Sequence, residues 1–177
     1  MNEIYVLGER HHLIFGTIVQ HFARFERLVE VAIARILGAQ FPLVAIVVSG
    51  LGYSAKCEAL TSLLGVVSGP AECADAITSA LAEFKKYVPL RNAIAHHPWK
   101  EGTRPQTIKH LSVSSRGGKA IWRGMEDDDR DYTIDELIDI ADRLLETHDK
   151  LVAYFVETGL MEKAVFDTAP ASSSKEE

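Results

Sequence analysis

Three observations predict an all-α fold, an antiparallel four-helix up-and-down bundle with a small β-hairpin inserted before the last helix. Apolar residues recur at helical spacing in long segments near both ends of the chain, and glycine or proline punctuates these segments. A stretch rich in β-branched residues surrounds a Gly-Gly pair before the last of them. The chain has 177 residues, which suits one domain. We expect a single domain over residues 1–165 and a disordered tail at 166–177.

The first long helix is expected over residues 10–37, because Gly38 is a typical residue after a helix end. At about 100° per residue, polar and apolar side chains separate onto two sides of this helix. Glu26 is the exception, since it falls among the apolar residues. The apolar side is formed by Phe15, Ile18, Phe22, Phe25, Val29, Ile33 and Ile36.

The middle of the chain predicts three further helical segments. A short apolar helix comes first, and a second long helix follows for which Ser54 is a suitable N-cap. A third helix should cover residues 71–96. Pro89 predicts a kink or a broken turn inside it, because proline removes a helical hydrogen bond. Pro98 disfavours helical geometry at the residue before it, so the helix should end near His96.

The segment after this helix changes character. Residues 106–124 carry β-branched residues on both sides of Gly117-Gly118, which predicts a β-hairpin. The acidic run that follows, "EDDDRD", is interpreted as a solvated loop.

The last helix has a clear start. Thr133 and Glu136 have the spacing of a capping box, so a helix is expected from there to about Glu157. Gly159 follows its end. The predicted apolar stripe of this helix comprises Ile134, Leu137, Ile138, Ala141, Leu144, Leu145, Leu151 and Val152.

Composition limits the possible functions. The net charge is −6 with a pI near 5.6, so any site for an anion must be a local patch. Cys57 and Cys73 lack the spacing of a metal site and are expected to be reduced core residues of a cytoplasmic protein. The first residues do not have the pattern of a signal peptide, and no apolar run is long enough to cross a bilayer. We therefore expect no membrane role.

Polar chemistry concentrates in "LRNAIAHHPW", residues 90–99. On a continuous third helix, Arg91 falls on the apolar stripe, where an unpaired charge is costly. Glu26 is the complementary exception on the first helix. We expect the two to meet, or to line one water-filled cleft.

His96 completes the candidate site. Asn92 lies one helical turn before it and can orient the imidazole, and Lys85 falls near it on the same helical wheel. His97 is expected to be a polar neighbour. A histidine can gain and lose a proton near neutral pH, and an arginine can bind a phosphate with several donors. Together they suffice for cleavage of RNA without a metal, because the 2′-hydroxyl is already the nucleophile.

The segment Arg91-Asn92-Ala93-Ile94-Ala95-His96 resembles the R-x4-H signature of the HEPN superfamily. The resemblance covers the helical part, roughly residues 8–160, and excludes the hairpin. It implies a helical bundle, a homodimer that brings two motifs together, and a metal-independent endoribonuclease of a prokaryotic toxin–antitoxin or defence system. In that interpretation Arg91 and His96 are catalytic, RNA is the substrate, and an antitoxin or other protein is a possible partner.

Two alternatives remain open, and a third, a metal site, is not favoured. Asn92 and His96 can serve only to end a helix, with Arg91 in a structural ion pair. HEPN-like domains without nuclease activity act as dimerisation or interaction modules. Adjacent histidines suggest a metal, but neighbours on a helix point about 100° apart and no carboxylate follows at ligand spacing, so no metal and no cofactor are expected.

Overall fold

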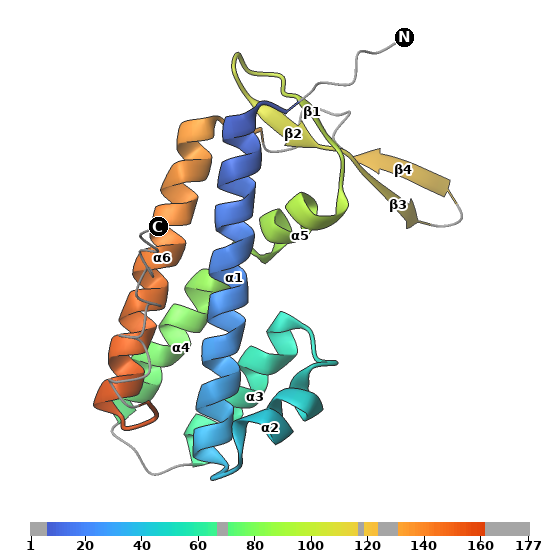
Figure 1. Ribbon diagram of the computed structural model, residues 1–177. Helices are drawn as coiled ribbons and strands as arrows, with labels where there is room; N and C mark the ends of the chain where they lie inside the picture. The colour runs from blue at the N-terminus through green and yellow to red at the C-terminus, as the bar shows by residue number, and fades with distance from the viewer. Residues whose placement is uncertain (1–6, 67–70, 117–118, 124–130, 162–177) are drawn as a thin grey trace, which may run out of the picture. The chain divides into compact units, whose positions relative to one another are not determined.

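The computed structural model describes residues 7–66, 71–116, 119–123 and 131–161, with the backbone alone for residues 71–73, 112–116 and 119–123. In these ranges the chain is mostly helical, with antiparallel strands before the last helix (Figure 1). The helices are α1 (Glu9–Ile36), α2 (Phe41–Val48), α3 (Tyr53–Val66), α4 (Ala71–Lys85), α5 (Val88–His96) and α6 (Ile134–Glu157). The strands are β1 (Trp99–Glu101), β2 (Ile108–His110), β3 (Ser112–Arg116) and β4 (Lys119–Arg123).

The chain divides into two compact units. The first unit comprises Met1–Phe25 and Ala82–His148, and the second comprises Glu26–Leu81 and Asp149–Glu177. The single domain expected over residues 1–165 stays a prediction. The tail expected at 166–177 lies outside the described residues.

The predicted helix ends are confirmed at both long helices. Gly38 follows α1 with φ +61°, and Gly159 follows α6 with φ +72°, a conformation that costs glycine little. The apolar side of α1 is buried from Phe15 to Ile33. Ser54 is not the residue before α3, since the helix begins one residue earlier at Tyr53.

The third predicted helix is interrupted at the expected place. α4 ends at Lys85 and α5 begins at Val88, with Pro89 in the first turn of α5, where its missing N–H has no helical acceptor. The break changes the helical phase. Sides assigned from one continuous helical wheel are therefore not valid for residues after Lys85. Ala95, which one continuous wheel from residue 71 places on the same apolar stripe as Arg91, is exposed.

Aromatic side chains form the core of the first unit. The Phe84 ring on α4 is stacked on the Phe25 ring with centroids 3.5 Å apart and meets the Phe22 ring edge-on at 5.4 Å. All three side chains are at most 1% exposed. Nearer the start of α1, the Phe15 ring lies 4.7 Å from that of Trp99 on β1. These contacts attach α1 to α4 and to β1, the strand that directly follows α5.

Two hairpins lie between α5 and α6. The predicted one is confirmed: β3 pairs antiparallel with β4, from Ser112 opposite Arg123 to Arg116 opposite Lys119. The second was not predicted. In it, β1 pairs antiparallel with β2, and an isolated bridge joins Ile108 to Tyr132 just before α6.

Polar and cation–π contacts join helices of the second unit. The Arg27 guanidinium on α1 lies 3.4 Å from the centroid of the Phe41 ring on α2. The Tyr53 hydroxyl on α3 donates a hydrogen bond of 3.3 Å to the carbonyl of Leu81 on α4. Lys56 links α3 to α1 through an ion pair described below. No single helix in the described ranges is both long enough and apolar enough to cross a membrane.

Candidate functional site

Helix α5 carries the R-x4-H segment and is held by two of its residues. Leu90 is 5% and Ala93 is 2% exposed, so these side chains anchor the helix. Asn92 and His96 are both exposed, and His96 is the last helical residue. Since residues four apart share one side of a helix, Asn92 and His96 lie on the same exposed side, as predicted.

Arg91 lies at the margin of this surface. Its side chain is half-buried, and its Nη1 donates a hydrogen bond of 3.1 Å to the Oδ1 of Asn92. Its Nε is buried and has no hydrogen-bond partner within the described part of the chain. The neighbouring amide thus fixes one terminal nitrogen of the guanidinium, and the buried Nε keeps an unused donor.

His97 is held in place beside the motif. The backbone turns extended there, with φ −119° and ψ 144°, and the His97 N–H donates to the carbonyl of Ala93 at 3.0 Å. The imidazole of His97 is stacked on that of His110, with ring centroids 5.6 Å apart and an interplanar angle of 27°. Sequence reasoning missed His110, because it reaches this place only through the pairing of β2 with β1, where it lies opposite Trp99.

Lys85 is exposed at the end of α4. Its position near His96 was predicted from one continuous helix. Lys85 and His96 belong to two helices, so that basis does not hold, and the proximity itself stays a prediction.

Glu26 has a partner that the sequence analysis did not consider. The Nζ of Lys56 lies 3.0 Å from the Oε2 of Glu26 and 2.8 Å from the Oε1 of Glu30. Lys56 is only 6% exposed. Burial lowers its pKa, but hydrogen bonds to Glu30 and Glu26 outweigh burial and raise it above the ordinary value. The predicted pairing of Glu26 with Arg91 joins two different units and stays a prediction.

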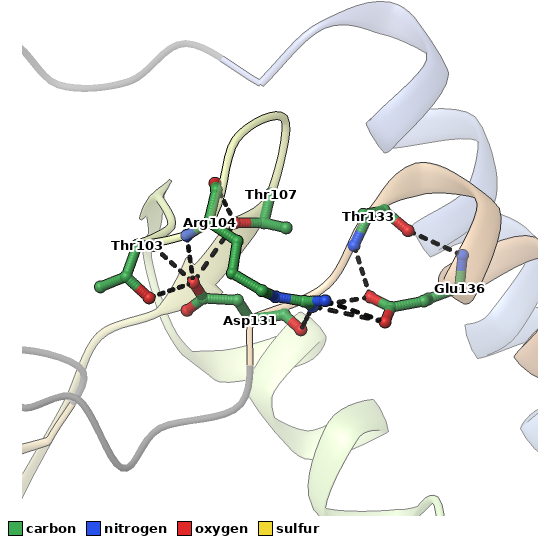
Figure 2. Close-up of polar contacts among 6 residues, drawn as sticks. All are labelled: Thr103, Arg104, Thr107, Asp131, Thr133 and Glu136. Atoms are coloured by element: carbon green, nitrogen blue, oxygen red, sulfur yellow. Dashed lines mark hydrogen bonds and ion pairs between the residues drawn. The ribbon is translucent and has the colours of Figure 1, made fainter.

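The acidic run contains a structural residue. Asp131, at its end, is 4% exposed, so the interpretation of this position as a solvated loop is wrong. Its Oδ2 accepts hydrogen bonds from the N–H and hydroxyl of Thr103, both 2.5 Å, and from the N–H of Arg104 at 3.0 Å (Figure 2). The preceding residues, 126–130, lie outside the described ranges.

Hydrogen bonding controls the charge of Asp131. Burial would raise the pKa of the carboxyl, but the bonds from Thr103 and Arg104 and the charge of Lys109 hold it below its usual value. Asp131 is thus an ionised acceptor that orders the loop between β1 and β2.

The first unit also has a cavity of about 430 Å³ between α5 and α6. Leu90 contributes to its wall, but the motif residues Arg91, Asn92 and His96 do not. Its charged lining combines Lys86 and Arg143 with Glu136 and Asp139. The mixture of signs gives no preference for an anion, so we do not assign the phosphate site to this cavity.

In the part of the chain that the structure describes, no three His, Cys, Asp or Glu side chains gather closely enough to hold a metal ion. Comparison with family models, curated proteins and solved structures finds no match to this chain. The functional argument therefore rests on the residues of α5 and their surroundings.

Proposed function

We propose that the chain is a metal-independent endoribonuclease of the HEPN type. The observation that carries the proposal is the arrangement on α5, where Arg91 and Asn92 are hydrogen-bonded and His96 is exposed at the last residue of the same helix. The resemblance of residues 91–96 to the R-x4-H signature supports it. Arg91 and His96 have the catalytic roles, and Asn92, His97, Lys85 and Glu26 are supporting residues.

The proposed reaction needs one cation and one proton carrier. The 2′-oxygen attacks the adjacent phosphorus, the bond from phosphorus to the 5′-oxygen breaks, and a 2′,3′-cyclic phosphate and a 5′-hydroxyl result. His96 transfers the proton between these oxygens. The Arg91 guanidinium stabilises the negative charge that develops on the phosphoryl oxygens, with Asn92 holding its Nη1 in place.

The same proposal includes the wider organisation. The helices would form an antiparallel four-helix bundle, and two copies of the chain would bring their motifs together in a homodimer in the cytoplasm. An antitoxin or another protein of a defence system would regulate it. No cofactor has a role in this reaction.

Purified chain, incubated with a mixed RNA pool in excess EDTA, tests the proposal. We expect wild type to cut RNA and both Arg91→Ala and His96→Ala to lose the activity by roughly 100-fold or more, the usual effect of removing a proton-transfer group or a charge-stabilising donor. His12→Ala is the matched control, because His12 is an exposed histidine on α1 whose Nδ1 contacts only the carbonyl of Gly8 among the bonds described for it. Equal activity in the motif variants and the control contradicts the mechanism.

A second candidate function has an observation of its own. On α2, the exposed fractions of Leu43, Ile46 and Val47 are 59%, 72% and 78%, and these residues share one side of the helix. Clusters of exposed apolar side chains are typical of protein-binding surfaces. This favours a non-catalytic interaction module as the alternative.

Ile46→Glu separates the two functions. An interaction module is expected to lose partner binding or self-association with this variant while Arg91→Ala and His96→Ala leave it unchanged. A nuclease is expected to show the reverse pattern in RNA cleavage.

A further inference from the structure

A row of aromatic rings leads from the core of the first unit to the motif. The Phe15 ring lies 4.7 Å from Trp99, Trp99 lies 5.7 Å from His110, and His110 lies 5.6 Å from His97, all measured between ring centroids. Phe15 and Trp99 are each 7% exposed, whereas His97 is half-buried. The row thus ends in an imidazole that is partly open to solvent, one residue after His96.

The backbone fixes this terminal ring from both sides. The N–H of His97 is bonded to the last turn of α5, and two residues later the chain enters the ladder of β1 with β2. The N–H of Leu111 donates to the carbonyl of Pro98 at 2.8 Å, which extends the pairing to the residue next to His97. A ring held by its neighbours loses little freedom when a ligand packs on it.

We propose that His97 is a stacking platform for one nucleobase of single-stranded RNA. The inference rests on the proposed function, because it places the base beside the phosphate that Arg91 and His96 would bind. Single-stranded RNA is commonly bound by stacking of its bases on aromatic side chains, histidine included. The Cα atoms of His97 and His96 are about 3.8 Å apart, so a base on His97 belongs to a nucleotide next to the scissile phosphate.

The platform predicts a property that a purely structural stack lacks. If His97 only supports β1 and β2, then His97→Ala changes the stability of the protein, and its effect on RNA affinity does not depend on which nucleotides carry a base. If His97 stacks on a base, removing that base and removing the ring each weaken RNA binding by a similar factor. Removing both causes no further loss, because both changes break the same contact.

The test is equilibrium binding of a short fluorescent RNA to the full chain in EDTA. The RNA is 2′-O-methylated throughout so that it cannot be cut, and a single abasic nucleotide is moved along it. Because stacking on an aromatic side chain contributes about 1–3 kcal/mol per base, we expect His97→Ala to weaken binding of the intact RNA by about 5- to 150-fold. His97→Phe should retain the affinity, and it keeps the test valid where the alanine variant does not fold.

One abasic position should weaken binding to wild type by a similar factor and should show no further loss with His97→Ala. Additive losses at every position, an unchanged affinity of His97→Ala, or no binding of the RNA by wild type would overturn the platform.

Cleavage of the unmodified RNA, measured in parallel, keeps this proposal separate from the proposed function. Non-additive binding without any cleavage supports the platform and rejects the nuclease. Cleavage that depends on His96, with additive losses in binding, supports the nuclease and rejects the platform.

Discussion

Arg104 and Glu136 form an ion pair in which both terminal nitrogens of the guanidinium lie 3.0 to 3.3 Å from the carboxylate (Figure 2). The same carboxylate accepts the N–H of Thr133 at 2.8 Å in the capping box of α6. The Arg104 Nη2 also donates to the carbonyl of Asp131 at 2.6 Å. One arginine thus links the loop between β1 and β2 to the start of the last helix.

Acid should weaken this link. The hydrogen bond from Arg104, followed by that from the Thr133 N–H, lowers the pKa of Glu136 below 4.5. Because the folded-state pKa is depressed, the contribution of Glu136 to stability is complete above the unfolded value and is lost as pH falls through the folded value. We expect Glu136→Gln to be less stable than wild type near neutral pH and, in denaturant titrations, to approach it as pH falls through the folded-state pKa of Glu136. A constant difference at all pH values would contradict this.

Gly102 approaches Asp131 so closely that no larger residue fits without movement. A Cβ added at Gly102 would lie 2.8 Å from Oδ2 and 2.9 Å from Cγ of Asp131, and closer still to the Thr107 hydroxyl. We expect Gly102→Ala to lower the free energy of unfolding by about 1–3 kcal/mol. Gly16→Ala, in the middle of α1 with nothing within 4 Å of its added Cβ, should instead raise it by about 0.5–1 kcal/mol. Equal effects of the two variants would refute the steric argument.

The capping box of α6 should be measurable by itself. The N–H of Glu136 donates to the hydroxyl of Thr133 at 3.1 Å. Removing the hydroxyl leaves that N–H without its cap, so Thr133→Ala should cost about 1 kcal/mol in thermal or chemical unfolding. Thr133→Ser keeps the acceptor and should remain close to wild type. A serine variant as unstable as the alanine variant would assign the effect to the lost methyl group instead.

The buried ion pair of the second unit predicts a large effect. Lys56→Met leaves the half-buried Glu26 without the cation it contacts and leaves Glu30 only the longer ion pair with Arg27, so we expect a loss of about 2–4 kcal/mol in the free energy of unfolding. Removing the charges together, in a Glu26→Gln, Glu30→Gln, Lys56→Met variant, should recover part of the loss. If the triple variant is less stable than Lys56→Met, charge is not the cause.

The pairing of Lys56 also has a pH dependence. Since the pKa of Lys56 is raised above 10.5, its contribution is complete below that pH and is lost as pH rises through the folded value. Wild type should therefore lose stability in the strongly alkaline range more steeply than Lys56→Met. Parallel curves for the two proteins would contradict this.

Local patterns in the sequence predicted much of the fold. The long amphipathic helix at the start, the capping box at Thr133, the glycines after both long helices and the hairpin around Gly117 all depend on residues close together in the chain. Pro89 marked the break between α4 and α5, but it also reset the helical phase. For this reason the wheel placed Ala95 wrongly on the apolar stripe, and the position of Lys85 near His96 stays a prediction.

Contacts between distant segments were beyond the sequence patterns. His110 joins the candidate site only through the register of a three-residue strand, and Asp131 is buried by a loop 27 to 28 residues earlier. The sequence does contain one signal for the partner of Glu26. Lys56 shares the spacing of Tyr53, Cys57 and Leu60, so it lies on the buried side of α3, where a partner for Glu26 was to be expected.

The most direct test of the central claim uses two substrates that differ by one oxygen. An RNA cut by the chain in excess EDTA is compared with the same RNA carrying a single 2′-deoxynucleotide on the 5′ side of the cut. We predict cleavage of the first by wild type and not by His96→Ala, with 2′,3′-cyclic phosphate ends, and no cleavage of the second at that position. Cleavage of both substrates by wild type, or ends without the cyclic phosphate, would contradict attack by the 2′-hydroxyl and with it the proposed mechanism.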